Sequence, residues 1–233
     1  MESERADMPW YRQPQNPIPF SINRKITSND PARSAFTSVA SFPWSMSSLS
    51  NLCDGSLDSG NARSQWTQVV QDCSGASVVG AKGRIYIMPR PGERRTPLCV
   101  RVPEGDNHLH SADIRCVAWA MCSLLVPEVV VLFAAASLLY VVDVRRHGII
   151  GYLRGHGGPI TSISVHPVHP YIICTTSRDF TTRIYDLTQT PAQYPNNPHW
   201  PPSKEPSMAG AAFGLQMSEP EGQGVGRCVA VLA

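Results

Sequence analysis

Residues 153–187, LRGHGGPITSISVHPVHPYIICTTSRDFTTRIYDL, constrain the fold of this chain more than any other stretch. The apolar positions from Ile160 to Val165 predict a short strand that stops at a His-Pro pair. Residues 171–176 are rich in aromatic and β-branched side chains and predict a second strand, and residues 182–187 predict a third after a polar turn. Three strands in so short a stretch indicate one unit of a repeated antiparallel fold.

The same pattern occurs once more upstream. Residues 114–120, 129–135, 138–144 and 148–153 predict four strands, and their continuous apolar runs are typical of strands that are buried on both faces. Asp143 and Asp186 lie 43 residues apart, which matches the ~40 to 45 residue period of a four-stranded propeller blade. The chain therefore contains an internal repeat.

These observations predict an all-β fold, an incomplete β-propeller of about two to three blades that follows a disordered N-terminal tail. Propellers close with about four to eight blades, so we expect the sequence to be a truncated part of a longer propeller. The expected segments are a tail at 1–60, rich in Pro, Ser and Asn; an irregular first blade at 61–112, with a strand at 64–71; a degenerate second blade at 113–153; and a third blade at 154–233, with a Pro- and Gly-rich insert at 188–227 before a last strand at 228–232.

The Gly155-His156 turn, the turn with Asp179 and the pair Tyr185-Asp186 resemble the WD-repeat family. In that family a buried hydrogen-bond relay ties the turns to the sheet, and the resemblance places it on His156, Thr175, Asp179 and Tyr185. The family has Trp where this chain has Tyr185, and a phenol oxygen lies farther from the backbone than an indole nitrogen. We therefore expect the contact with Thr175 to be the weak point of the relay. A catalytic His156–Asp179 pair is the alternative, but no nucleophile stands at a matching position.

Within the WD-repeat family the chain is similar to the Polycomb-group proteins embryonic ectoderm development and extra sex combs. The likeness rests on RCVAW at 115–119, YLRGHG at 152–157, HPVHP at 166–170 and SRD at 177–179. It implies a nuclear, non-catalytic scaffold of a histone methyltransferase complex that acts in transcriptional repression. One face of such a propeller binds a SET-domain subunit, and the other holds trimethyl-lysine of a histone tail in an aromatic cage.

The resemblance places Arg115 at the position of a cage tyrosine, where its charge would repel a trimethylammonium group. The resemblance therefore does not extend to methyl-lysine reading by this chain. We instead interpret Arg115 and Arg178 as a rim that faces protein partners.

Other functions remain open. The chain is a candidate WD-repeat adaptor of another complex, in substrate recruitment or in an RNA or signalling assembly, with the cytoplasm as the alternative location. An enzyme that uses a thiol or a His/Asp pair is disfavoured, because the sequence lacks G-x-S-x-G, H-E-x-x-H and a Gly-rich phosphate loop. A membrane anchor is also disfavoured, because residues 129–142 would span about 21 Å as a helix, short of a ~30 Å hydrocarbon core.

Net charge and cysteine content further narrow the classes of function that the sequence allows. A net charge of +2 favours no direct contact with nucleic acid. Seven cysteines without a C-x-x-C pair indicate reduced thiols. The groups His108, His110, Cys116 and His166, His169, Cys174 lack the paired spacing of a zinc site. We expect no cofactor, no metal and no small-molecule substrate.

Overall fold

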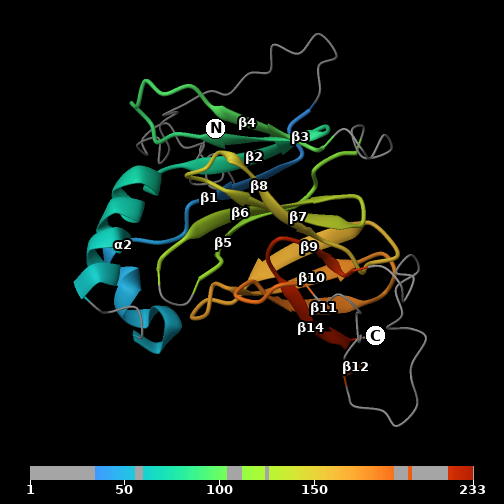
Figure 1. Cartoon of the computed structure of the whole chain (residues 1–233). Helices are drawn as coiled ribbons and strands as arrows, with labels where there is room; N and C mark the ends of the chain where they lie inside the picture. Colours follow the sequence, from blue (N-terminus) through green and yellow to red (C-terminus); the bar gives the residue numbers. More distant parts are fainter. Residues whose placement is uncertain are drawn as a thin grey trace, which may run out of the picture. The chain divides into compact units, whose positions relative to one another are not determined.

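The computed structural model describes residues 35–55, 60–103, 112–123, 126–191, 199–200 and 220–232. All of them belong to the compact unit Ser34–Ala233. Their strands form three sheets, one of four strands and two of five, and neighbouring strands are antiparallel except in one short parallel pair (Figure 1). The expected fold class, an all-β incomplete propeller, is confirmed.

Each sheet corresponds to one blade. The first sheet has the order β1 (Ser38–Ser41), β2 (Ser77–Ala81), β3 (Arg84–Met88) and β4 (Leu98–Arg101). The second has the order β5 (Val117–Met121), β6 (Val129–Ala135), β7 (Leu138–Asp143), β8 (Gly148–Leu153) and β13 (Gly222–Gln223). The third has the order β9 (Ile160–Val165), β10 (Ile172–Ser177), β11 (Thr182–Asp186), β14 (Arg227–Leu232) and β12 (His199–Trp200).

The second sheet lies between two apolar cores. Alternate residues of β6 point to opposite faces: Val131 and Phe133 belong to the core shared with the first sheet, and Leu132 belongs to the core shared with the third. All seven residues of β6 are buried. This two-sided burial explains the continuous apolar run in the sequence.

The apolar run 129–142 is a hairpin of β6 and β7 rather than a helix. Among the described residues, no helix has the length and apolar character needed to cross a membrane.

The predicted tail at 1–60 is wrong over 38–55, where the chain forms β1 and the 3-10 helix η2 (Met46–Gly55). The hydroxyls of Thr37 and Ser38 each donate to the carbonyl of Ile114, at 2.6 Å. Gly80, which pairs with Ser38, leaves room for this close approach because it has no side chain. Four residues held by polar contacts with distant strands carry no hydrophobic periodicity, so the pattern did not reveal them. Residues 1–34 lie outside the described part.

Aromatic residues of the same segment complete the first core. The rings of Phe42 and Trp119 meet edge to face at 5.3 Å, and those of Trp44 and Trp66 lie 6.2 Å apart. The Trp66 indole donates to the Ser45 carbonyl at 3.2 Å. These side chains therefore stabilise the fold, because buried aromatic pairs add to hydrophobic burial.

The strand predicted at 64–71 is also wrong, since Gly60–Cys73 form the helix α2. Its buried residues, Ala62, Trp66, Val69, Val70 and Cys73, follow helical spacing, so they make one apolar face. Gly75 follows the helix with a φ of 76°, a left-handed conformation that commonly ends a helix.

The insert 188–227 is not only a loop. Gly222 and Gln223 form β13, which pairs with Leu153 and Tyr152 at the outer edge of the second sheet. The buried Glu221 fastens this segment: its carbonyl accepts from the amide of Arg154 at 2.7 Å, and its carboxylate accepts from the amide of Cys228 at 2.9 Å. The last strand, predicted at 228–232, is confirmed as β14 beside β11.

Candidate functional site

The structure brings His156, Thr175 and Asp179 together in a buried relay at one end of the third sheet. The His156 Nδ1 atom lies 3.0 Å from Asp179 Oδ2, and its Nε2 atom lies 2.8 Å from Thr175 Oγ1. A carboxylate only accepts hydrogen bonds, so Nδ1 carries the proton. In the neutral ring Nε2 then accepts from the Thr175 hydroxyl.

Asp179 also fixes the turn between β10 and β11. Its Oδ2 accepts from the amide of Gly157 at 2.7 Å, and its Oδ1 accepts from the amide and the hydroxyl of Thr181 at 2.9 and 2.7 Å. One carboxylate therefore joins this turn to the loop that carries His156.

Electrostatics keep the two relay partners in complementary states. Burial lowers the pKa of His156 below its ordinary value, although the Asp179 carboxylate opposes that shift. Partial burial raises the pKa of Asp179, but hydrogen bonds from Thr181 and Gly157 outweigh it and lower the pKa to about 2. A neutral imidazole therefore faces an ionised carboxylate near neutral pH.

Tyr185 lies beneath the relay, with 1% of its surface exposed. Burial raises the pKa of its phenol, and a hydrogen bond with Thr175 partly opposes that shift.

Sequence reasoning missed Arg183, which is fully buried beside this cluster. Gly155, with a φ of 137°, lies against its guanidinium, where a Cβ atom would stand 2.5 Å from Nη1. The glycine of the Gly-His turn is thus required both by its backbone conformation and by the space that Arg183 occupies.

The relay is closed to substrates. The side chain of His156 is 0% exposed, and both ring nitrogens are bonded to protein groups. A general base needs access to the proton that it abstracts, so the geometry is that of a structural group.

Arg115 and Arg178 meet at a small pocket on the rim of the second and third sheets. Both side chains are exposed, and the pocket between them measures about 210 Å³. Its remaining lining residues are mostly small or apolar: Ala112, Asp113, Ala134, Ala136, Pro159, Ile160 and Thr161. Arg115 also lies 3.9 Å from Asp113.

Sequence reasoning also missed Phe180, in the same turn as Arg178. Its side chain is 93% exposed and its φ is 64°. The signal in the sequence was a bulky residue directly after Ser-Arg-Asp, where a tight turn favours Gly or Asn.

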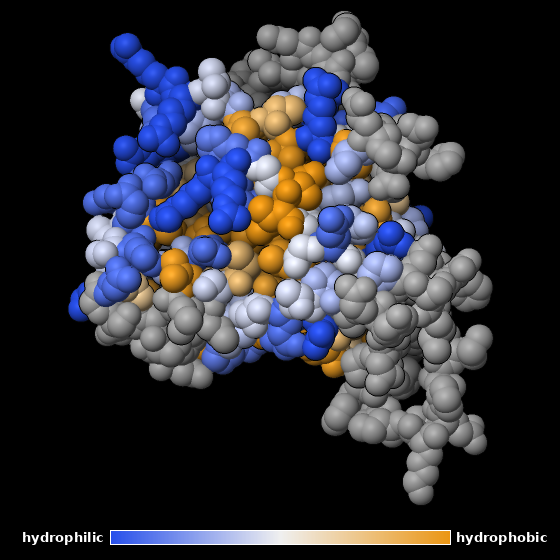
Figure 2. Space-filling view, viewed as in Figure 1, coloured by the Kyte–Doolittle hydropathy of each residue, from blue (hydrophilic) through white to orange (hydrophobic). Residues whose placement is uncertain are grey.

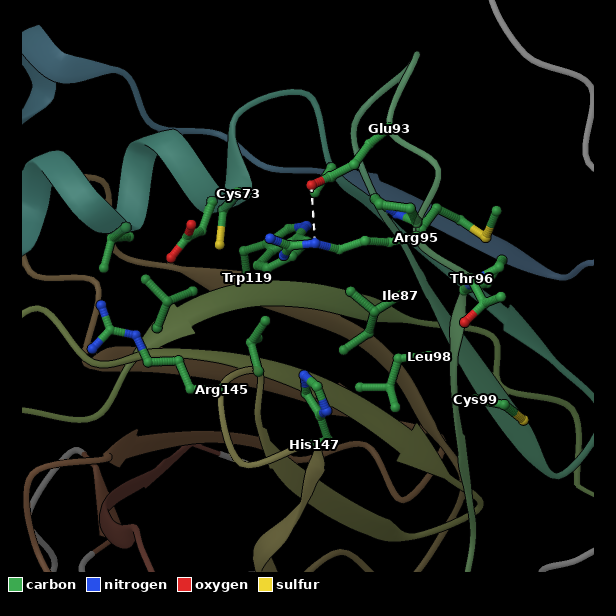
Figure 3. Close-up of a pocket in the computed structure, with 18 residues that line it drawn as sticks. Cys73, Ile87, Glu93, Arg95, Thr96, Leu98, Cys99, Trp119, Arg145 and His147 are labelled. Carbon is green, nitrogen blue, oxygen red and sulfur yellow. Dashed lines mark ion pairs between the residues drawn. The ribbon is translucent and has the colours of Figure 1, made fainter.

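A larger pocket of about 610 Å³ lies between the first and second sheets (Figure 3). Trp119, Ile87 and Leu98 supply apolar lining, and the turn after β7 contributes Arg145 and His147. An ion pair of 3.1 Å joins Glu93 to Arg95 in the loop before β4. Figure 2 shows hydrophobic residues gathered between hydrophilic ones on the face viewed there.

The two His/Cys groups named from the sequence were considered as zinc ligands. Among the described residues, no cluster of three His, Cys, Asp or Glu side chains could hold a metal ion. The rings of His166 and His169 stack on each other, with centroids 5.0 Å apart. His108 and His110 lie outside the described part.

The family comparison identifies the repeat that contains the relay. Residues 148–186 match the family model described as "WD domain, G-beta repeat". These residues include β8 of the second sheet and β9, β10 and β11 of the third, so the match covers the strands around the relay.

Single relatives cover different shares of the chain. Fifty residues, 22% of the chain, are 44% identical to the small ribosomal subunit protein RACK1 of Dictyostelium discoideum and span 15% of that protein. Among solved structures, the Polycomb repressive complex 2 of Chaetomium thermophilum bound to GSK126 has a chain with a TM-score of 0.47 and 18% identity. That likeness covers 70% of this chain and 31% of the other.

Two further structures also give TM-scores below 0.5. An active Polycomb repressive complex 2 in the basal state gives a TM-score of 0.48 and 18% identity over 70% of this chain and 29% of the other. Sqt1 of Chaetomium thermophilum, bound to the N-terminus of ribosomal protein L10, gives a TM-score of 0.38 and 17% identity over 48% of this chain and 28% of the other.

Proposed function

We propose that this chain is a non-catalytic WD-repeat scaffold that binds protein partners through the rim formed by Arg115 and Arg178. The observation that carries the proposal is that the relay is inaccessible whereas two exposed arginines line one pocket. The buried polar groups serve the fold, and the exposed ones are free to meet another protein. Arginine is enriched at the energetic centres of protein interfaces, which supports a partner-facing role for this rim.

We further propose a nuclear role in a Polycomb-type histone methyltransferase complex that represses transcription. The support is the sequence likeness over 115–119, 152–157, 166–170 and 177–179. The partners would be a SET-domain subunit and a histone tail. Arg115 at the cage position argues against trimethyl-lysine as the feature of the tail that this chain binds.

The test is affinity purification of the full chain from nuclear extract, followed by an assay of histone lysine methylation in the recovered material. We expect a SET-domain methyltransferase with the wild-type chain and at least a tenfold lower recovery with the double variant Arg115→Glu, Arg178→Glu. Arg84→Glu, Arg101→Glu on the first sheet is the matched control. Recovery of partners without any chromatin factor would contradict the Polycomb assignment.

One observation favours a second candidate, an adaptor in a different, cytoplasmic assembly. The 44% identity over 50 residues is to a protein of the small ribosomal subunit. Sedimentation of the chain with 40S particles from cytoplasmic extract, lost in the same double variant, would favour this alternative.

A further inference from the structure

Phe180 occupies an unfavourable backbone conformation without any gain from burial. Its φ of 64° is in the left-handed region, which bulky side chains rarely adopt. Its ring is 93% exposed, so it contributes almost nothing to the hydrophobic core. Residues held in such conformations often cluster at sites of function.

The surrounding turn holds Phe180 in place. The Ser177 hydroxyl donates to the Gly158 carbonyl at 2.8 Å, and the amide of Arg178 donates to the Pro159 carbonyl at 3.0 Å. Asp179 adds its bonds to Gly157 and Thr181. These contacts fix both ends of the turn, so the backbone of Phe180, and with it the direction of its Cα–Cβ bond, is defined before any partner arrives.

The shorter turn between β6 and β7 of the second sheet also contains a left-handed residue that is not glycine. Ala136, between β6 and β7, has a φ of 50° and a small, half-buried side chain. The longer turn of the third sheet, between the paired residues Thr176 and Thr182, places a benzyl group at its left-handed position. The size of Phe180 is therefore not a requirement of the turn.

The arginines near Phe180 in the sequence and at the small pocket indicate the chemistry of the partner that Phe180 would contact. Arg178 precedes it by two residues, and Arg115 lies across the small pocket. The floor of that pocket includes Ala134 and Ile160. At about 210 Å³ the pocket is smaller than the ~300 to 1,000 Å³ of ligand sites, so it suits one apolar side chain of a protein better than a free ligand.

We propose that Phe180 is the anchor of a docking surface, together with Arg115 and Arg178, for an acidic segment of a partner protein. The partner supplies an apolar recess for the ring, carboxylates for the two arginines and a small apolar side chain for the pocket between them. Aromatic and arginine side chains commonly carry most of an interface's energy. The inference rests on the proposed rim and names the chemistry of its partner.

A display library of random 12-residue peptides, selected on the full chain, tests this chemistry without assuming a partner. We expect the enriched peptides to carry Asp or Glu beside apolar residues. Synthetic copies should bind Phe180→Ala and Arg178→Glu at least about tenfold more weakly than the wild type, as measured by fluorescence anisotropy. Raising the salt concentration should weaken binding to the wild type, because exposed charges are screened.

Two variants separate recognition from folding. Phe180→Gly relieves the backbone conformation, so it should lose peptide binding while its thermal midpoint stays equal or rises. Met46→Ala, which shortens an exposed apolar side chain on η2, should bind as the wild type does. Enriched peptides without acidic residues, or peptides that bind Phe180→Ala and wild type equally, would overturn the proposal.

Failure of the docking surface and failure of the proposed function give different experimental results. If Phe180→Ala still co-purifies a methyltransferase but no peptide depends on Phe180, the docking surface is wrong and the scaffold role stands. If acidic peptides depend on Phe180 but no methyltransferase is recovered, the docking surface stands and the Polycomb assignment fails.

Discussion

The second and third sheets have the same core order of four antiparallel strands but different interiors. Every residue of β6 in the second sheet is apolar and buried. The equivalent region of the third sheet buries His156, Thr175, Arg183 and Tyr185. The interior of one blade is therefore filled by apolar side chains, and that of its neighbour includes a polar relay.

This difference between the two sheets shows where apolar packing suits a blade and where hydrogen bonds do. The second sheet is covered on both faces, so apolar side chains can fill both cores. The third sheet carries the rim turn with Arg178 and Phe180, where loops rather than strands must be fixed. Directional hydrogen bonds position loops better than apolar contacts do, because they specify geometry as well as proximity.

The largest expected effect is in the apolar blade. Phe133 is fully buried and stacked on Tyr140, with ring centroids 5.0 Å apart. Phe133→Ala should lower the free energy of unfolding by about 3–5 kcal/mol, because it leaves a cavity. Urea denaturation followed by circular dichroism measures this, with the exposed Phe180→Ala as the control. A loss below about 1 kcal/mol would show that packing does not hold the second sheet.

Removing the Asp179 carboxylate, at the centre of the relay, should lower the free energy of unfolding by less. Asp179→Ala leaves Gly157, Thr181 and His156 without their acceptor, and we expect a loss of about 2–3 kcal/mol in the same measurement. Asp186→Ala is the matched control, since that carboxylate also accepts turn bonds, from Thr188 and Gln189, but has no histidine partner. Equal losses would mean that the histidine link adds nothing to the turn.

The relay should also make the third blade sensitive to acid. The pKa of His156 is lowered in the folded state, so below about pH 6.5 the unfolded chain binds a proton that the folded chain resists. Stability should therefore fall as the pH drops from 6.5 to 5, by less than about 1.4 kcal/mol per pH unit. Asp179, whose folded pKa is about 2 against 3.8, adds a further loss below about pH 4.

Urea midpoints across this pH range, for the wild type and His156→Gln, test the assignment. The slope between pH 6.5 and 5 should flatten in His156→Gln and persist in the control His147→Gln, which changes an exposed histidine. An unchanged slope in His156→Gln would place the acid sensitivity elsewhere.

The smallest expected effect is a gain in stability. Phe180→Gly removes the cost of a left-handed conformation but adds flexibility to the unfolded chain, so we expect about 0.5 kcal/mol of stabilisation. The thermal midpoint measures it, and Phe180→Ala should show less gain because alanine keeps a Cβ atom. A loss of stability would mean that the exposed ring has a structural contact after all.

Local patterns in the sequence predicted much of the second and third sheets. The strands at 129–135 and 148–153 match β6 and β8, and the Gly-His and Ser-Arg-Asp turns located the residues that the structure brings together. These predictions succeeded because strand alternation and turn chemistry are encoded in neighbouring residues.

Sequence patterns did not predict the elements that form only where distant segments of the chain meet. Short strand β1 depends on Ile114 and Gly80, and β13 depends on β8, so neither has a signal of its own. Residues 64–71 show both strand-like composition and helical spacing, and burial of one face selected the helix α2. The site was incomplete for the same reason, because neither burial of Arg183 nor exposure of Phe180 can be read from adjacent residues.

The sequence by itself thus determined the repeat, its period and the polar residues available for a relay. Only the tertiary structure decided that His156 and Asp179 are sealed from substrates, that Arg115 and Arg178 share one pocket, and that Phe180 remains exposed. The physical reason is that residue type and spacing set local conformation, whereas burial and shared surfaces depend on which strands become neighbours.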